Sequence, residues 1–282
     1  MKKAVFHRLA MNDRNSLQEL ATSVGWYFEP ARADIYISCG VVFGHRIDNH
    51  LVSSAALFCY GSSLSSLGTV IVHPAFQGRG LGRRIVQRCL SEADCLNVPV
   101  SLVATKEGFP LYTSLGFRTV SFIHRLYLNQ KKLPVKVNKS RFSPLTIEDF
   151  SAIIAFDKKI FGADRSHIYQ GLFEHCHQGI VIKEPVNTLR GFAMSFHMGN
   201  CIHIGPLLAK SIEDAFELIQ PFLISPSLPI RIDVPSGQHE FINELREYGF
   251  EETLVSPLMI RNSDALPGER KKMFAIIDPA LG

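Results

Sequence analysis

The 282-residue sequence predicts an α/β protein made of two similar halves, each built around a mixed sheet with flanking helices. Short β-rich apolar segments alternate with segments whose apolar residues recur at helical spacing. The same succession returns after a lysine-rich polar stretch, and the length suits two domains of about 140 residues each. We therefore expect an N-terminal domain at residues 1–130, a linker at 131–142 and a C-terminal domain at 143–282.

The first half is expected to combine helices with an apolar hairpin. Asp48-Asn49 is a turn dipeptide between two strand-like runs, and Gly116 follows a short helical segment as its C-cap. The expected elements are a helix at 16–24, strands at 34–38, 41–47, 52–60 and 98–104, a helix at 109–117 and a strand at 119–128.

A glycine-rich turn between a strand and a helix is the most informative feature of this half. Residues 69–72 predict a buried strand, after which Gly78, Gly80 and Gly82 let the backbone turn tightly with its N–H groups facing outward. Arg83 and Arg84 then open the helix, where positive charge opposes the helix dipole at a cost of roughly 0.3–1 kcal/mol per residue. A bound anion offsets that cost, so the turn predicts a phosphate-binding site. The buried stripe of this helix is expected at Leu81, Ile85, Val86, Cys89, Leu90 and Ala93.

The motif in this turn distinguishes between classes of phosphate-binding loop. It lacks the Gly-Lys-Ser/Thr ending of nucleoside triphosphatases, and its third glycine is misplaced for a dinucleotide fold. The order strand, Gln77-x-x-Gly80-x-Gly82, helix instead resembles the pyrophosphate loop of the GCN5-related N-acetyltransferases. In that family a Tyr-x-x-x-Gly-Phe helix follows, as residues 112–117 do here.

This resemblance implies acetyl-CoA as co-substrate, no metal, and a set of site residues. Tyr112 would donate a proton to the departing thiolate, and a backbone N–H of the strand carrying Val70 and Val72 would stabilise the tetrahedral oxygen. A tyrosine that only packs under the cofactor is the alternative. The implied cofactor-binding residues are Val70, Ile71, Val72, Gln77, Gly78, Arg79, Gly80, Leu81, Gly82 and Arg83.

The resemblance does not name a general base. Many members of the family use a carboxylate near the first cofactor strand, but residues 67–72 contain none. An acid from the second half, such as Asp157, Asp164 or Asp233, is one possibility. The other is that the acceptor amine arrives neutral, and we assign no base.

The second half repeats the plan but changes the cofactor turn. Between its apolar strand and the next helix lies a segment without glycine, residues 209–214, in which Ser211 and Asp214 form an ordinary helix start. The carboxylates of Glu213 and Asp214 would repel a pyrophosphate, so only the first half is predicted to bind CoA. The expected elements are a helix from 150 to about 161 after a Thr146/Asp149 capping box, a second helix capped by Asp164, strands at 179–183, 190–197, 201–208 and 229–234, a helix from 211, and a helix ending in residues 248–250.

Nearly the whole chain resembles a two-domain bacterial acetyltransferase group with a degenerate second domain. The shared features include Gly25-Trp26 in the first half, and residues 161–165 and 204–207 in the second. By analogy the second half would shape the acceptor pocket, with Asp164 or Arg165 near it. A helix cap with a surface ion pair is the alternative role for these two residues.

Composition limits the partners and the compartment. Hydrophobic residues make up 46% and charged residues 20%, and the net charge is +4, as in ordinary folded proteins. No apolar run predicts a membrane span or a signal peptide, and the linker's basic residues lack interleaved aromatics, so we expect a cytoplasmic protein without a membrane or nucleic-acid partner. The six cysteines form no C-x-x-C pair, and the adjacent His175-Cys176-His177 cannot easily converge on one metal ion.

The sequence therefore predicts an acetyl-CoA-dependent N-acetyltransferase that acts on a primary amine of an unknown acceptor. Direct attack in a ternary complex is expected, because no activating base accompanies Cys89 or Cys95. The alternative is a non-catalytic acyl-CoA-binding sensor. The oligomeric state is left open.

Overall fold

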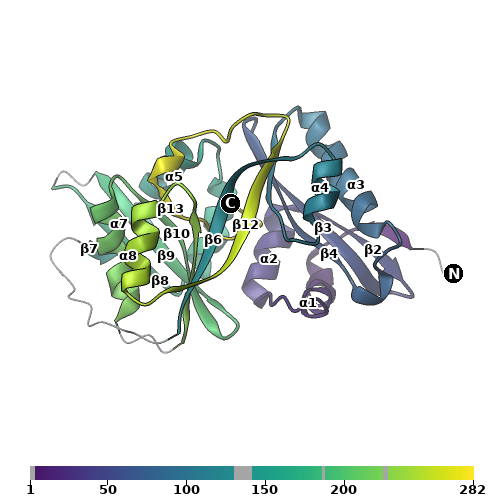
Figure 1. The fold of residues 1–282 in the computed structure, drawn as a ribbon, viewed down its shortest axis with the longest axis horizontal. Helices are drawn as coiled ribbons and strands as arrows, with labels where there is room; N and C mark the ends of the chain where they lie inside the picture. The colour runs from purple at the N-terminus through teal and green to yellow at the C-terminus, as the bar shows by residue number, and fades with distance from the viewer. Residues whose placement is uncertain (1–3, 130–141, 186–187, 225–227) are drawn as a thin grey trace.

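The computed structural model describes residues 4–129, 142–185, 188–224 and 228–282. Within them a single 13-stranded sheet runs through both halves of the molecule, in the order β1-β2-β3-β4-β5-β12-β6-β11-β10-β9-β8-β7, with β13 added beside β10. Figure 1 shows the two lobes side by side, with helices on both faces of this sheet. The mixed α/β fold class is confirmed.

The first half contains six strands and four α-helices among the described residues. They are β1 (Val5–Arg8), α1 (Arg14–Thr22), α2 (Pro30–Cys39), β2 (Val41–Ile47), β3 (His50–Tyr60), β4 (Leu64–Val72), α3 (Leu81–Leu96), β5 (Val100–Val103), α4 (Phe109–Ser114) and β6 (Arg118–Leu128).

The second half adds seven strands and four α-helices within the described ranges. They are β7 (Phe142–Pro144), α5 (Phe150–Phe161), α6 (Ser166–Glu174), β8 (Gln178–Lys183), β9 (Leu189–Met198), β10 (Cys201–Ala209), α7 (Ile212–Ile219), β11 (Ile230–Pro235), α8 (His239–Glu247), β12 (Glu251–Arg261) and β13 (Met273–Ala275).

Several local predictions are confirmed at the level of the backbone. Asp48 and Asn49 both have positive φ (47° and 67°), as a tight hairpin turn requires. The Thr146/Asp149 capping box is present, since the Thr146 N–H donates to Asp149 Oδ2 (3.0 Å). The buried residues of α3 are the six of the predicted stripe. Local chemistry therefore determines these elements.

The predicted strand at 34–38 is wrong, because these residues lie in helix α2. Pro30 occupies the first turn of this helix, where its fixed φ favours helical backbone. The β-favouring side chains Ile35, Tyr36 and Ile37 are all buried, and the Tyr36 ring lies 5.7 Å from that of Phe58 on β3. Burial against the sheet outweighs their weak preference for extended backbone.

The two halves exchange strands in the middle of the sheet. β12 lies between β5 and β6, pairing Leu258 with Val103 on one side and Ser256 with Ile123 on the other. β6 in turn pairs with β11, Ile232 facing Leu126. Residues 131–141 of the expected linker lie outside the described residues, and Phe142 begins β7. The domain boundaries stay a prediction, but the sheet itself is continuous.

Candidate active site

β4 and β5 part halfway along their length and leave a gap in the sheet. The two parallel strands pair only at Ser65 with Val100 and at Ser66 with Ser101, although β4 continues to Val72. The β3–β4 register shifts at the same level, between Ser54 and Ala56 on β3. Thr69 has a φ of 49° there and forms a bulge.

The bulge is followed by backbone donors that face the gap. His73 N–H donates to Val52 O on β3 (2.9 Å). Since successive N–H groups of a strand point to opposite sides, those of Val72 and Val70 point away from β3, towards the gap. Ile71, between these two residues, pairs with Ser54 of β3, and only 2% of its surface is exposed. The hydroxyl of Thr69 is also buried at the bulge, without a hydrogen-bond partner among the described residues.

The turn after β4 is held by its own side chains. Gln77 Nε2 donates to Val72 O (3.1 Å), and Arg79 donates to Ala75 O (3.1 Å) while lying over the Phe76 ring. Gly78 and Gly80 have φ values of 74° and 71°, which side-chain-bearing residues adopt at a cost. These contacts fold the turn into a compact loop.

The start of α3 presents unpaired backbone donors beside this loop. Gly80 is its N-cap and has no side chain to cap the helix, and the first N–H to find a helical acceptor is that of Arg84, which donates to Gly80 O (3.1 Å). In the described part of the chain no acceptor meets the N–H groups of Leu81, Gly82 and Arg83. The Arg83 side chain donates to Ser114 Oγ on α4 (2.6 Å). This arrangement suits an anion of two phosphates.

Tyr112 lies on α4, where only 7% of its surface is exposed. Its ring meets that of Phe117 edge-on, with centroids 6.0 Å apart. The hydroxyl has no hydrogen-bond partner among the described residues. Burial raises the pKa of Tyr112 above its ordinary value, and the neighbouring Cys89 raises it further. The phenol is therefore protonated at neutral pH and available as a donor.

Neither cysteine near this region is arranged as a nucleophile. Burial raises the pKa of the Cys89 thiol to about 12, so it is not a thiolate at neutral pH. Cys95 is exposed on the same helix, and all six cysteines are free thiols. No cluster of His, Cys, Asp and Glu suited to a metal occurs within the ranges the structure describes.

The three carboxylates considered as bases are each engaged elsewhere. Asp157 is buried and paired with Arg165 (2.5 Å). Asp164 accepts the Ser166 N–H (3.0 Å), and hydrogen bonds from Ser166 and Lys158 lower its pKa to about 2. Burial alone would raise the pKa of Asp233, but the adjacent Arg231 and Arg125 hold it below its ordinary value. Asp164 thus accepts the N–H of the first residue of α6, while Arg165 occupies the N-cap position and belongs to a buried ion pair.

The second half closes the corresponding helix start with its own residues. Ser211 Oγ accepts the Asp214 N–H (3.3 Å). The Asp214 carboxylate in turn accepts a bifurcated hydrogen bond from Arg190 Nε (3.1 Å to each oxygen) and one from Arg190 Nη2 (2.8 Å). Glu213 adds a second carboxylate to the first turn of α7. A phosphate would meet negative charge at this position.

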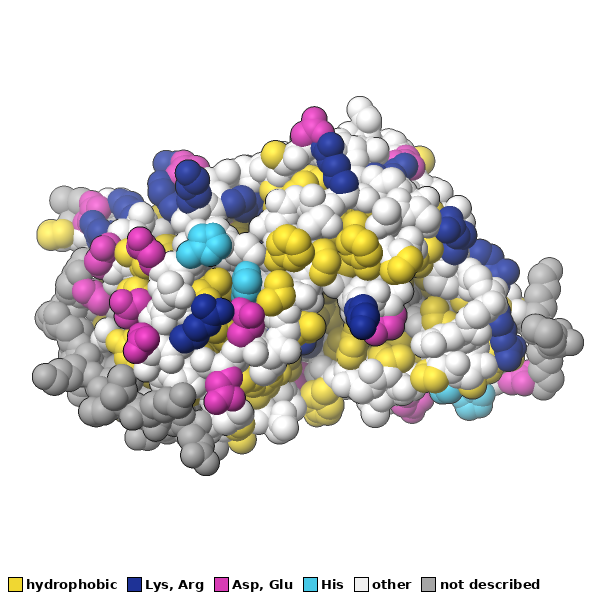
Figure 2. All heavy atoms as spheres, in the orientation of Figure 1, with side chains coloured by type: hydrophobic (Ala, Val, Ile, Leu, Met, Phe, Trp, Pro, Cys, Tyr) yellow, Lys and Arg dark blue, Asp and Glu magenta, His cyan; other side chains and the backbone are white. Residues whose placement is uncertain are grey.

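The surface around the gap is apolar. Hydrophobic side chains gather across the middle of the face in Figure 2. Among the described residues, Phe122 on β6 and Leu254 and Val255 on β12 are more than 40% exposed. Pro257, opposite Phe122, accepts the Ala104 N–H at the end of β5 (2.8 Å). This patch therefore adjoins the open end of the gap.

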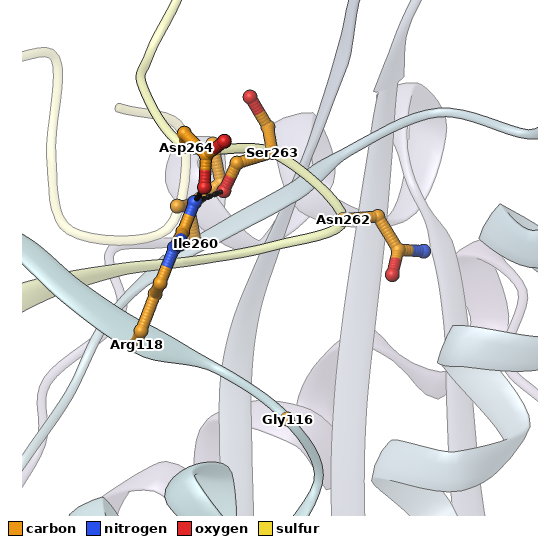
Figure 3. Close-up of a pocket in the computed structure, with 6 residues that line it drawn as sticks. All are labelled: Gly116, Arg118, Ile260, Asn262, Ser263 and Asp264. Atoms are coloured by element: carbon orange, nitrogen blue, oxygen red, sulfur yellow. Dashed lines mark hydrogen bonds and ion pairs between the residues drawn. The ribbon is translucent and has the colours of Figure 1, made fainter.

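Two surface hollows lie away from the gap. One, of about 400 Å³, is lined by Gly116, Arg118, Ile260, Asn262, Ser263 and Asp264 (Figure 3). Arg118 donates to Ser263 O (2.5 Å) and pairs with Asp264, so its charge is already compensated. The other lies along α1. In addition, none of the described helices is long and apolar enough to span a bilayer.

Family models and curated relatives match both halves of the chain. Residues 38–119 and residues 153–275 each match a model described as an acetyltransferase (GNAT) domain. The "Uncharacterized N-acetyltransferase YitH" of Bacillus subtilis is 29% identical over 270 residues, covering 95% of both chains. The "Holothin acyltransferase" of a Pseudoalteromonas species is 24% identical and covers 84% of this chain and 79% of its own length.

Solved structures share the fold over the whole chain. A Pyrococcus horikoshii protein assigned as an acetyltransferase superposes with a TM-score of 0.84 at 17% identity, covering 100% of this chain and 97% of its own. A tandem GNAT protein from the clavulanic acid pathway superposes at 0.67 with 14% identity, covering 93% and 100%. The relatives support an N-acyltransferase activity. With a match to the same family in each half, the chain is a two-domain member of the GNAT acetyltransferases.

Proposed function

We propose that the protein transfers an acetyl group from acetyl-CoA to a primary amine by direct attack in a ternary complex, and that the first half alone binds the cofactor. The observation that carries the proposal is the set of unpaired N–H groups at the start of α3 beside an open gap between β4 and β5. A pyrophosphate suits the N–H groups at the start of α3, and an extended arm with amide groups suits the gap between β4 and β5.

Each predicted cofactor-binding residue has a role in this arrangement. The N–H groups of Gly78, Gly80, Leu81, Gly82 and Arg83 would bind the diphosphate, with Gln77 and Arg79 holding the loop in shape. Val70 and Val72 would offer backbone donors to the arm or to the thioester oxygen, while Ile71 anchors the strand in the core. A Cβ at Gly82 would make only ordinary contacts, 3.5 Å from Val72 Cγ2 and 3.7 Å from Leu111 Cδ2, so a side chain can be introduced here without displacing the helix.

The protein would accelerate the attack of the amine on the thioester mainly through backbone N–H groups held in position. A thioester supplies an electrophilic carbon and a good leaving group. A backbone N–H of Val70 or Val72 would stabilise the negative oxygen that develops on attack, an effect that costs about 10²–10³ in rate when one such donor is lost. Val70 and Val72 are half-buried, and a bound cofactor would shield their N–H groups further from water, which would strengthen that interaction.

Tyr112 would act on the leaving sulfur. Because a phenol is a weaker acid than a thiol, complete transfer of its proton to a free thiolate is uphill. We therefore assign to Tyr112 a hydrogen bond to the sulfur that strengthens as the carbon–sulfur bond breaks. The raised pKa of the Tyr112 phenol keeps its proton in place for this hydrogen bond. The acceptor amine would enter neutral, since Asp157, Asp164 and Asp233 are already paired.

Replacement of Tyr112 by Phe tests this assignment against a non-catalytic sensor. We expect Tyr112→Phe to bind CoA as the wild type does, by calorimetry, and to lower kcat by about 10²-fold. Tyr248→Phe, at the end of α8 in the second half, is the matched control and should change neither. Absence of turnover in the wild type across polyamines, amino sugars and amino acids, with CoA binding intact, would favour the sensor.

A further inference from the structure

The second half contains a gap that repeats the one between β4 and β5. β10 and β11 pair in parallel only at residues 202–204 and 230–232, and then part. A bulge lies at the same level, between Ile204 and Leu207. Lys210 N–H donates to Arg190 O (2.8 Å), as His73 N–H does to Val52 O in the first half. Gly205 and Leu207 thus correspond to Gly68 and Val70.

This second gap is filled by the chain itself. β13 pairs with β10, Ala275 facing Leu207 and Met273 facing Leu208. On the other side, Ile276 N–H donates to Asp233 O on β11 (3.1 Å). Gln238 Nε2 donates to the carbonyls of Lys271 and Met273, both at 2.9 Å, and holds the entering segment. Residues 273–276 therefore pair with both β10 and β11. At the corresponding place in the first half, the backbone donors of β4 face an open gap.

The same segment continues from the second bulge to the first. A Cβ on Gly205 would overlap the Ile276 carbonyl oxygen, and a Cβ on Gly68 would overlap Ala280, whose Cα lies 2.7 Å from it. Ser66 Oγ, two residues before Gly68, donates to Ala280 O (2.7 Å). Both glycines that precede the bulges are thus covered by residues four positions apart in one segment.

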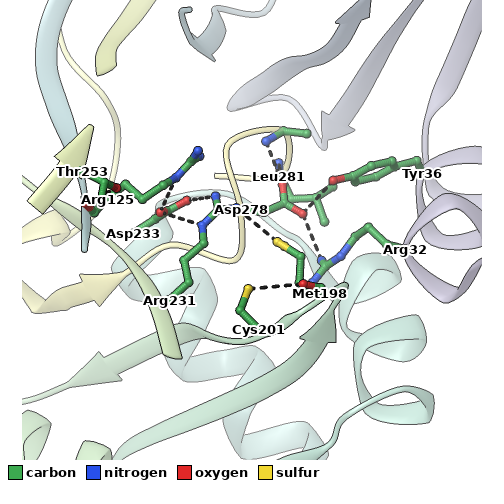
Figure 4. A network of polar contacts seen from close by, with 11 residues as sticks. Arg32, Tyr36, Arg125, Met198, Cys201, Arg231, Asp233, Thr253, Asp278 and Leu281 are labelled. Carbon is green, nitrogen blue, oxygen red and sulfur yellow. Dashed lines mark hydrogen bonds and ion pairs between the residues drawn. The ribbon is translucent and has the colours of Figure 1, made fainter. Parts of the chain in front are cut away.

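A buried aspartate fixes the turn between these two contacts. Asp278 Oδ1 accepts the N–H groups of Ala280 (2.7 Å) and Leu281 (2.9 Å). Its other oxygen accepts the Tyr36 hydroxyl (3.0 Å) and pairs with Arg32 (3.0 Å), both on α2 (Figure 4). Asp278 is 1% exposed, so these bonds are shielded from water. The path of the segment is therefore tightly determined.

We propose that residues 273–282, the bridging segment, permanently occupy the second gap in place of a cofactor arm and position the β4 bulge for catalysis in the first half. The second part of this inference rests on the proposed function. The bridging segment would set the direction of the Val70 N–H, which follows the bulge directly. Its residues would act through β4 rather than touch the substrate.

Amide hydrogen exchange of the full chain tests the occupancy. Without ligand, we expect the Leu207 amide to exchange at least about tenfold more slowly than those of Val70 and Val72, because Leu207 faces Ala275 of β13 whereas β4 and β5 no longer pair at Val70 and Val72. Coenzyme A should slow the Val70 and Val72 amides and leave that of Leu207 unchanged. Equal exchange at both sites, or slowing of Leu207 by coenzyme A, would overturn the inference. Protection of Leu207 without any effect of coenzyme A would instead count against the proposed function.

Replacement of Gly68 by Ala tests the positioning. The added methyl must displace either Ala280 or β4, and we expect kcat to fall by about 100-fold with unchanged CoA affinity, because a small misplacement at the reacting centre is costly. Exchange of the Ile71 amide should also accelerate, a readout that needs no turnover. Gly237→Ala, which meets no atom within 4 Å, is the control. Unchanged kcat together with unchanged Ile71 exchange would overturn the positioning role.

A milder pair of variants covers the case in which Gly68→Ala does not fold. Ser66→Ala removes the hydrogen bond to Ala280, and Ser195→Ala removes a similar bond from a buried serine to Gln178 O (3.3 Å) in the second half. We expect only Ser66→Ala to lower kcat and to accelerate exchange at Ile71. Equal effects of the two variants would mean that the hydrogen bond between Ser66 and Ala280 contributes only to general stability, and this would overturn the positioning role.

Discussion

Gly68, on the strand that lines the candidate cofactor gap, packs directly against Ala280, more than 200 residues later in the chain. No side chain fits between them, since a Cβ on Gly68 would lie 2.7 Å from Ala280 Cα. Tyr60 at the end of β3 makes a similar long-range contact, its hydroxyl donating to Leu281 O (2.9 Å). The first half is therefore completed by residues from the second.

We predict that the fragment 1–130 does not form a stable domain by itself. The fragment lacks β11 and β12, so β6 loses its partner strands on both sides and β5 loses one of its two. Removal of the bridging segment also uncovers Gly68 and Tyr60. Circular dichroism and calorimetry should show no cooperative unfolding transition for the fragment. A fragment that unfolds cooperatively and binds CoA would show that the exchange of strands is dispensable.

Gly82→Glu should weaken CoA binding without damaging the fold. It places a carboxylate in the first turn of α3, as Glu213 does in α7. The helix dipole favours this charge by roughly 0.3–1 kcal/mol, so stability should be kept, while repulsion of the pyrophosphate should weaken binding by more than about tenfold. Calorimetric titration with CoA and thermal unfolding measure the two effects. Gly82→Gln, which keeps the shape without the charge, is the control.

Asp164→Ala should reduce stability but leave turnover unchanged. Loss of the hydrogen bond from the Ser166 N–H at the start of α6 is expected to lower the free energy of unfolding by about 1 kcal/mol at pH 7. The folded-state pKa of about 2 lies below the ordinary 3.8, so this stabilisation is present above about pH 4 and disappears as the pH falls towards 2.

Denaturant unfolding of wild type and Asp164→Ala between pH 2 and 7 measures this difference. Asp264→Asn, at a side chain 92% exposed, serves as the control and should have no comparable effect. A loss of turnover in Asp164→Ala without a loss of stability would place Asp164 in the acceptor site instead.

The pH dependence of kcat/KM should follow the acceptor rather than the protein. If the amine enters neutral, kcat/KM rises tenfold per pH unit until the pH reaches the pKa of the amine. Two acceptors with different pKa values should therefore give different break points. A common break point, independent of the acceptor, would reveal a protein base.

Local features of the sequence predicted much of the backbone around the candidate site. The tight turn at Gly78 and Gly80, the apolar stripe of α3 and the turn at Asp48-Asn49 each depend on neighbours within a few residues, and the structure confirms them. The absence of a cap at Gly80 and the presence of one at Ser211 were predictable in the same way.

Long-range pairing was not predictable from local patterns. Residues 251–261 have no local feature that selects β5 and β6 of the other half as partners, because strand pairing is decided by the whole sheet. Helix α2 was missed since its buried Ile and Tyr side chains resemble those of a strand. The bridging segment also lacks a motif, although the parallel positions of Gly68 and Gly205 before each bulge offered a signal.

Calorimetric titration of the full chain with coenzyme A tests the central claim most directly. We predict one binding site per chain, weakened by more than about tenfold in Gly82→Glu and unchanged in Tyr112→Phe. Two sites per chain, no binding, or binding that survives Gly82→Glu unchanged would contradict the assignment of the cofactor to the start of α3.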